Sequence, residues 1–93
     1  MKDAAGYTIL VEGLVQGVGF RYFVKTSAER FNIKGFVKNM NSGDVYIEAE
    51  GTEQTMQEFL RLVKRGPRVA HVRKMTVEKM ETLKNFKKFE VAF

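Results

Sequence analysis

A glycine-bearing loop that ends in an arginine is the stretch of this sequence best suited to chemistry. It runs from Gln16 to Arg21, with Gly17 and Gly19 inside it. Glycine permits positive φ and close approach of the backbone to a ligand, so successive N–H groups can converge on one small anion. A guanidinium adds two parallel hydrogen bonds to a phosphoryl group, which a lysine cannot supply. The stretch therefore indicates a site for a single phosphoryl group.

The loop by itself is also compatible with a tight turn that carries a surface arginine. It is not the loop of the Walker type, because no Gly-Lys-Ser/Thr follows Gly19, and Tyr22 breaks a full dinucleotide-binding fingerprint. The apolar pattern predicts that a helix begins at Phe20. The partial positive charge of a helix N-terminus favours anion binding at the end of this loop.

A second unusual residue is Asn39, a polar residue at the end of a predicted strand, where asparagine has poor β propensity. In isolation it is equally compatible with a turn-former before the hairpin turn 41–44. If Asn39 faces the loop, its carboxamide can both accept from and donate to a bound water.

The spacing of apolar residues predicts the elements that must position these groups. A helical stripe at i, i+3 and i+4 spacing begins at Phe20 and ends near Asn32, which tolerates a left-handed cap. Thr52 is the expected N-cap of a second helix that Gly66 and Pro67 terminate. Alternating or continuous apolar runs predict strands at 7–13, 34–39, 45–50, 72–80 and 89–93, with 14–19 as a loop.

The order of elements is β-α-β-β-α-β with a short terminal strand. Two helices then fit on one face of an antiparallel sheet, which is the ferredoxin-like arrangement of the α+β class. Right-handed crossovers put the first and third strands in the middle, flanked by the fourth and the second. The weakest of these strands is the fourth, in which Lys79 would have to share the face of Met75 and Val77.

Composition limits the classes of function. The chain has 93 residues, enough for one domain spanning 1–93, and 44% of them are hydrophobic. Without cysteine it has neither disulfides nor a thiolate metal site, and His71 alone cannot build a zinc site. The net charge of +5 fits a nucleic acid, an anionic lipid, a phosphorylated small molecule or mere solubility. Residues 1–6 lack the apolar core of a signal peptide, so a cytoplasmic location is expected.

The two clusters together resemble the acylphosphatase family, from Tyr7 to Phe93. The differences are small: Phe36 stands where tryptophan is common, Asn32 where glycine is usual and Ser42 where aspartate is frequent. The matching motifs are Gly13-x-Val15-Gln16-Gly17-Val18-Gly19-Phe20-Arg21, then Ala28, Gly35-Phe36-Val37-x-Asn39-x-x-Ser42-Gly43-x-Val45, Glu50-Gly51 and Gly66-Pro67-x-x-Ala70-x-Val72.

The resemblance implies an enzyme that hydrolyses the mixed anhydride of a carboxylic acid and phosphate. It implies that Arg21 binds the phosphoryl oxygens and that Asn39 positions the attacking water. It implies no metal, no cofactor and no covalent phosphoenzyme, with a small acyl phosphate as substrate and inorganic phosphate as product. A monomer is expected, with no nucleic acid or membrane as partner. The backbone amides that would cradle the phosphate are those of Val15, Gln16, Gly17, Val18, Gly19 and Phe20.

Two alternatives remain open. The segment 34–37, Lys-Gly-Phe-Val, is similar to a fragment of the RNA-recognition motif, which shares this order of elements. It falls on the second strand rather than the third, and the paired aromatic residues at alternate positions are absent. The other alternative is a non-catalytic or carbamoyl-phosphate-handling module, of the kind found at the front of larger hydrogenase-maturation proteins.

Overall fold

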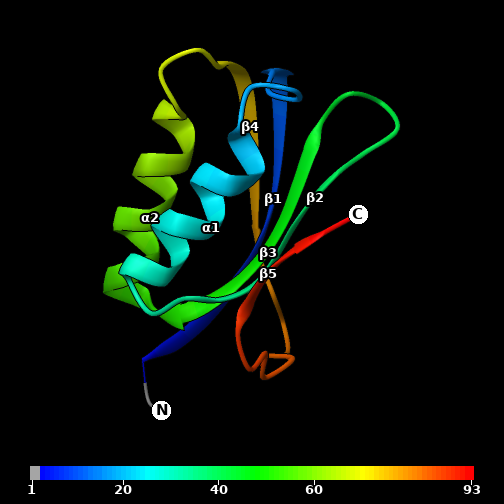
Figure 1. Cartoon of the computed structure of the whole chain (residues 1–93). Coiled ribbons are helices and arrows are strands. Elements are labelled where there is room, and N and C mark those ends of the chain that lie inside the picture. Colours follow the sequence, from blue (N-terminus) through cyan, green and yellow to red (C-terminus); the bar gives the residue numbers. More distant parts are fainter. Residues whose placement is uncertain (1–2) are drawn as a thin grey trace.

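Five strands and two helices form in the predicted order, and both helices lie against one face of the sheet (Figure 1). This is the α+β, ferredoxin-like arrangement that the sequence predicts. The computed structural model describes residues 3–93, so the part of the signal-peptide prediction that concerns residues 1–2 lies outside it. The elements are β1 (Ala4–Leu14), α1 (Phe20–Arg30), β2 (Lys34–Asn39), β3 (Val45–Thr52), α2 (Glu53–Arg65), β4 (His71–Lys79) and β5 (Phe89–Ala92).

The boundaries of the elements differ from the predicted ones where a neighbouring strand supplies partners. β1 is longer at both ends, since Ala4 pairs with Thr52 of β3 and Leu14 pairs with His71 of β4. The prediction that Leu14 belongs to the loop is therefore wrong. Lys79 is exposed, so the apolar alternation of β4 stops at Val77. In β4 only one face packs on the core, and a lysine at its end reaches solvent instead.

Local sequence signals fix the two helices. The Thr52 side chain caps α2 by accepting a hydrogen bond from the Thr55 N–H at 3.1 Å, as predicted. Asn32, just beyond α1, has a φ of 56°, the left-handed conformation expected of it. The core between the helices and the sheet is built by fully buried side chains that include Val24, Ala28, Ile47, Met56, Phe59 and Val63. No helix in the described part of the chain is long and apolar enough to cross a membrane.

The sheet order is β4-β1-β3-β2-β5, so the first and third strands are neighbours inside the sheet, as predicted. The pairs β1–β3, β1–β4 and β2–β3 are antiparallel. The prediction of an antiparallel sheet does not extend to β5, which runs parallel to β2 with Val37 opposite Val91. The reason is that β4 runs opposite to β2, and the connection after β4 reverses the chain while carrying it to the other edge of the sheet.

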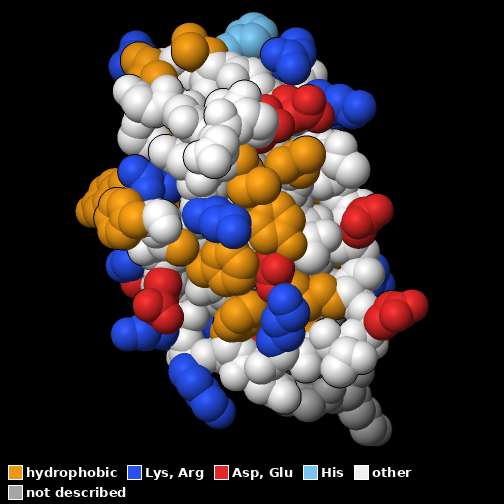
Figure 2. All heavy atoms as spheres, turned by 90° about the vertical axis from the view of Figure 1, so that its right-hand side faces the viewer, with side chains coloured by type: hydrophobic (Ala, Val, Ile, Leu, Met, Phe, Trp, Pro, Cys, Tyr) orange, Lys and Arg blue, Asp and Glu red, His pale blue; other side chains and the backbone are white. Residues whose placement is uncertain are grey.

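That connection, residues 80–88, is held on the face of the sheet that lacks helices. The Glu50 carboxylate accepts hydrogen bonds from the N–H groups of Lys84 and Phe86, and the Phe86 ring meets the Phe36 ring edge-on at 5.9 Å. Figure 2 shows hydrophobic side chains gathered in the middle of this face, with lysine, arginine and acidic side chains among them. The connection therefore crosses the open face and delivers β5 to the edge of β2.

Glu48 on the same face has a pKa that couples stability to pH. Burial alone would raise its pKa, but hydrogen bonds from Lys84 and Tyr46 outweigh burial and lower the pKa below its usual 4.5. The same carboxylate and burial raise the pKa of Tyr46 to about 12. A carboxyl whose pKa is lower in the folded chain adds stability above its unfolded pKa, and this stability is lost as pH falls through the folded pKa.

We expect Glu48→Gln to lower the free energy of unfolding by about 1 kcal/mol at neutral pH. The difference from wild type should shrink below pH 4.5, where the wild-type carboxyl becomes protonated. Urea unfolding at pH values on both sides of 4.5 measures it, with the exposed Glu81→Gln as control. An equal difference at all pH values would contradict the assignment.

Gly35 in β2 occupies a place that only glycine can fill. Its φ is 149°, and a Cβ there would overlap the backbone carbonyl oxygen of Glu48 on the neighbouring strand. Backbone atoms in the middle of a sheet cannot move aside without breaking the ladder. Since β2 carries Asn39 at its end, this close approach also sets the path of the strand toward the site.

We expect Gly35→Ala to destabilise the fold by at least about 3 kcal/mol, because it adds both steric overlap and backbone strain. Gly43→Ala is the matched control, since its φ is 99° but a Cβ there meets nothing within 4 Å. The control should lose only about 1 kcal/mol. Urea denaturation of both variants measures the two changes in the free energy of unfolding. Equal losses of stability would show that steric overlap is not the cause.

Candidate active site

The loop between β1 and α1 has the conformation of an anion cradle. Gly17 and Gly19 have φ values of 74° and 77°, in the left-handed region that other residues adopt only with strain. A Cβ added at either glycine would meet nothing within 4 Å. The loop backbone thus borders open space, and its turns through left-handed glycines allow successive N–H groups to face the same point.

Buried side chains fix this loop at both ends. Val15 and Phe20 are each 1% exposed, and Val18 packs against the same core. Gly19 is the N-cap residue of α1, and no side chain caps the helix there. The first N–H groups of a helix have no partners within it, so here they remain available to a ligand.

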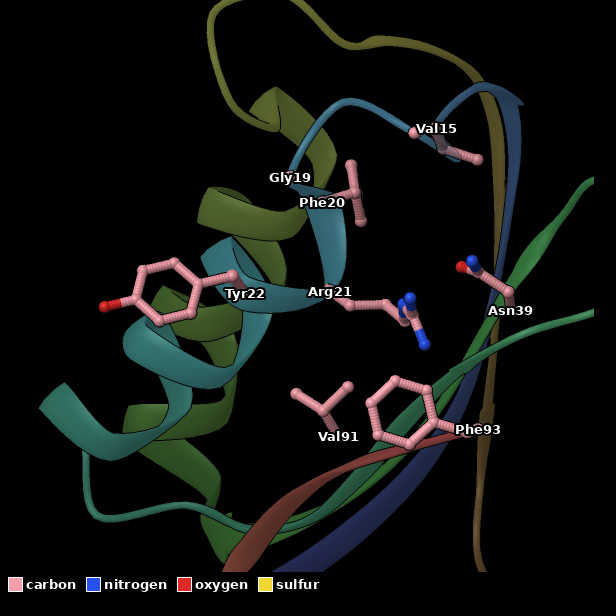
Figure 3. Close-up of a pocket in the computed structure, with 9 residues that line it drawn as sticks. Val15, Gly19, Phe20, Arg21, Tyr22, Asn39, Val91 and Phe93 are labelled. Carbon is pink, nitrogen blue, oxygen red and sulfur yellow. The ribbon is translucent and has the colours of Figure 1, made fainter.

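Arg21, in the first turn of α1, is held by the last strand. Its Nη1 donates to the Ala92 carbonyl oxygen at 3.2 Å, and its guanidinium carbon lies 4.9 Å from the centre of the Phe93 ring. The side chain is half-buried. Figure 3 shows the guanidinium extending from α1 toward the space beside Asn39. A guanidinium has five N–H donors, so one bond to a carbonyl leaves several for a phosphoryl group.

Asn39 is the last residue of β2, and its carboxamide points into the same space (Figure 3). Its Oδ1 atom is buried and has no hydrogen-bond partner in the described part of the chain. Leaving a buried acceptor unsatisfied costs about 1–3 kcal/mol. An orphaned acceptor of this kind marks the place of a ligand or a bound water.

These groups surround one pocket of about 370 Å³. Among the described residues that line it, Arg21 is the only one with a charged side chain. Of the residues predicted from the sequence, Gln16 and Val18 do not line the pocket, because one side chain bonds to the β2–β3 turn and the other packs on the core. The lining residues are Val15, Gly17, Gly19, Phe20, Arg21, Tyr22, Asn39, Val91 and Phe93.

Sequence reasoning missed Tyr22, Val91 and Phe93 as lining residues. Tyr22 is adjacent to Arg21 but 73% exposed, and nothing in its type distinguishes it from a surface aromatic residue. The other two come from β5 and the residue after it. They reach the site only because β5 lies parallel to β2, with Lys38 opposite Ala92. No sequence pattern shows which strand a terminal strand will join.

The chemistry open to this pocket is the binding of one phosphoryl group beside a bound water. The loop amides and Arg21 offer donors for negative oxygens on one side. The Asn39 carboxamide offers an acceptor on the other side, where a water can be oriented. The other lining side chains are largely apolar, with Val15 and Phe20 buried and Tyr22 and Phe93 exposed, so the pocket is open to solvent on one side.

Comparisons with known proteins agree with this geometry. Residues 7–91 match the acylphosphatase family model. An acylphosphatase from Archaeoglobus fulgidus is 52% identical over 85 residues, which cover 91% of this chain and 94% of that protein. An acylphosphatase from Bacillus subtilis is 40% identical over 87 residues, covering 94% of this chain and 96% of its own.

Solved structures extend the agreement to the fold. The crystal structure of acylphosphatase from Bacillus subtilis superposes with a TM-score of 0.93 at 39% identity, covering 96% of this chain and 99% of that one. None of these comparisons favours the RNA-binding alternative. The family model, the relatives and the solved structure all match nearly the full length of the chain. The chain therefore belongs to the acylphosphatase family and is a hydrolase of acyl phosphates.

Proposed function

We propose that the 15–20 loop and Arg21 hold the phosphoryl group of a small acyl phosphate while Asn39 positions the water that attacks it. Water adds to phosphorus, and the bond from phosphorus to the bridging oxygen breaks. The electron pair of that bond goes to the leaving carboxylate. One water proton moves to a phosphoryl oxygen, so the products are a carboxylate and dihydrogen phosphate.

The proposed groups suffice for this reaction. A carboxylate is a good leaving group, so no strong acid is needed to protonate it. Phosphoryl transfer then depends on positioning and on stabilising charge on the equatorial oxygens. Unpaired backbone N–H groups and one guanidinium supply that stabilisation without reorganising during the reaction. In the proposal the phosphate oxygen of the substrate takes the proton, and no step requires a metal.

The orphaned Asn39 Oδ1 is the observation that carries the proposal. It is buried, it has no hydrogen-bond partner among residues 3–93, and it shares a pocket with Arg21. A water that donates to this oxygen has its lone pairs free to face the phosphorus. This arrangement separates the two roles, since Asn39 contacts the water and Arg21 contacts the phosphoryl oxygens.

The proposal extends to the state in which the protein works. We propose that residues 1–93 act as one domain, as a monomer, in the cytoplasm and without a nucleic acid partner. The proposed reaction uses Arg21 and Asn39, which line one pocket of the same chain, so the mechanism does not require a second copy. Sedimentation during turnover and cell fractionation would test the monomeric state and the location.

We expect Arg21→Ala to lower kcat/KM for benzoyl phosphate by at least about a thousandfold, because it removes the fork that binds the phosphoryl oxygens. Inorganic phosphate should cease to inhibit competitively. Steady-state kinetics with EDTA present measures both effects. Arg21→Lys should recover only part of the loss, since it restores the charge but not the paired donors. Full activity of either variant would refute the role.

We expect Asn39→Ala to lower kcat by about 10²- to 10³-fold while inorganic phosphate still binds, because only the water loses its partner. The inhibition constant of phosphate and kcat on benzoyl phosphate separate the two effects. Asn41→Ala, the same substitution at an exposed turn residue, is the matched control. A wild-type kcat for Asn39→Ala would rule out the water-positioning role.

A further inference from the structure

Gln16 uses both hydrogens of its side-chain amide on the β2–β3 turn. Its Nε2 donates to the Met40 carbonyl oxygen and to the Asp44 carbonyl oxygen, each at 2.8 Å. The residue is half-buried, so water competes only partly for these bonds. Among residues 3–93, no other side chain of the loop forms a hydrogen bond with this turn, so Gln16 alone links the loop to Met40 and Asp44.

The two carbonyl groups are those that close the hairpin. The Met40 N–H donates to the Asp44 oxygen at 2.8 Å, and the Gly43 N–H donates to the Met40 oxygen at 3.1 Å. Met40 directly follows Asn39, which pairs with Val45 at the end of the ladder. The Gln16 amide therefore binds the hairpin at Met40, one residue away from Asn39, which is proposed to hold the water.

Apart from the Gln16 link, the two halves of the site are joined through β3, whose Val45 pairs with both Val11 of β1 and Asn39 of β2. The loop is anchored through Val15 and Phe20 in the helix-side core, and Arg21 is braced by the Ala92 carbonyl. Asn39 stands at the far end of β2, and its path is set by the β2–β3 ladder. The pairing of β3 with β1 and β2 stops at Val45, so among residues 3–93 the Gln16 amide is the hydrogen-bonded link between the loop and the turn beyond that pair.

We infer that Gln16 is a positioning residue that fixes the distance between the phosphate loop and Asn39, so that the bound water lies in line with the phosphorus. This inference rests on the proposed function of Arg21 and Asn39. Gln16 itself contacts neither phosphate nor water through its side chain. It acts through the turn, and misplacement of a reacting group by about 1 Å can lower a rate by about a hundredfold.

The role depends on two N–H donors at one uncharged nitrogen, which the glutamine side chain provides at this reach. Methionine has a similar length but no donor, so it keeps the packing and loses the link. Glutamate has the same shape but presents a carboxylate to two carbonyl oxygens, which repels the turn at neutral pH. The two variants therefore disturb the link by different means while changing the volume little.

The test compares kcat for benzoyl phosphate with the inhibition constant of inorganic phosphate. Gln16→Met should lower kcat by about tenfold to a hundredfold, while the phosphate constant changes by less than about threefold. Gln16→Glu should lower kcat at least as much. A loss of folding alone would instead lower the amount of active enzyme and the unfolding midpoint, leaving kcat per folded molecule unchanged.

A double-mutant cycle with Asn39→Ala separates positioning from a general effect. If Gln16 acts through Asn39, adding Gln16→Met to Asn39→Ala should reduce kcat by less than about twofold more. If the two residues act independently, the losses multiply within about a factor of two. If the two losses of kcat multiply in the double variant, the inference is overturned.

Two matched controls complete the experiment. Gln57→Met makes the same exchange at an exposed glutamine of α2, where the amide bonds only to Glu53. Ser42→Ala removes a side-chain bond to Asp44 in the same turn without touching Gln16. Both should keep kcat within about twofold of wild type. A wild-type kcat for Gln16→Met, with Asn39→Ala impaired, refutes the inference alone, whereas an inactive wild type refutes the proposed function.

Discussion

An anion site made from backbone amides works only if those amides have no partner inside the protein. In the turn from β1 into α1, Gly17 and Gly19 take left-handed conformations, and no side chain of residues 3–93 caps the helix. Unpaired N–H groups are tolerated only at a surface that a ligand or solvent can reach. The rest of the fold therefore has to hold this loop rigid while leaving one side of it open, and the buried Val15 and Phe20 do so.

Each group at the site is supported by a different element, and the sheet brings these elements together. β1 and α1 carry the loop, β2 carries Asn39, and β5 supplies the carbonyl that braces Arg21. β1 and β2 are separated in the sheet by β3, so the loop and Asn39 are near each other only above the end of that strand. The Gln16 amide bridges this gap, which explains why a glutamine stands within a loop whose other members are small or apolar.

The part of this architecture that could be predicted from the sequence is the part that local patterns encode. The spacing of apolar residues predicted all seven elements, because a helix or strand with one buried face repeats its apolar residues with a characteristic period. The cap at Thr52 and the left-handed Asn32 followed from residue chemistry within one turn. Arg21 and Asn39 stood out by residue type and position, and their roles came from motif resemblance. The pocket that they share became visible only in three dimensions.

The features that escaped prediction depend on pairs of segments far apart in the chain. The parallel pairing of β5 with β2 requires the 80–88 connection to cross the open face of the sheet. Hydrogen bonds to the Glu50 carboxylate hold the connection there, and no short sequence pattern reveals them. The pocket wall formed by Val91 and Phe93 depends on that register. The Gln16 link was missed for a similar reason, since its acceptors are backbone carbonyl groups and carry no signature of side-chain type.

The contact between Arg21 and Ala92 joins residues 71 positions apart, almost the whole length of the chain. Forming a contact of such long range costs the entropy of closing a long loop, which other contacts must offset. Until β5 docks beside β2, Arg21 lacks its brace and one wall of the pocket is absent. Any state of the chain in which β5 is not docked therefore has a phosphate loop without a complete pocket, so enzyme activity requires the last strand to be in place.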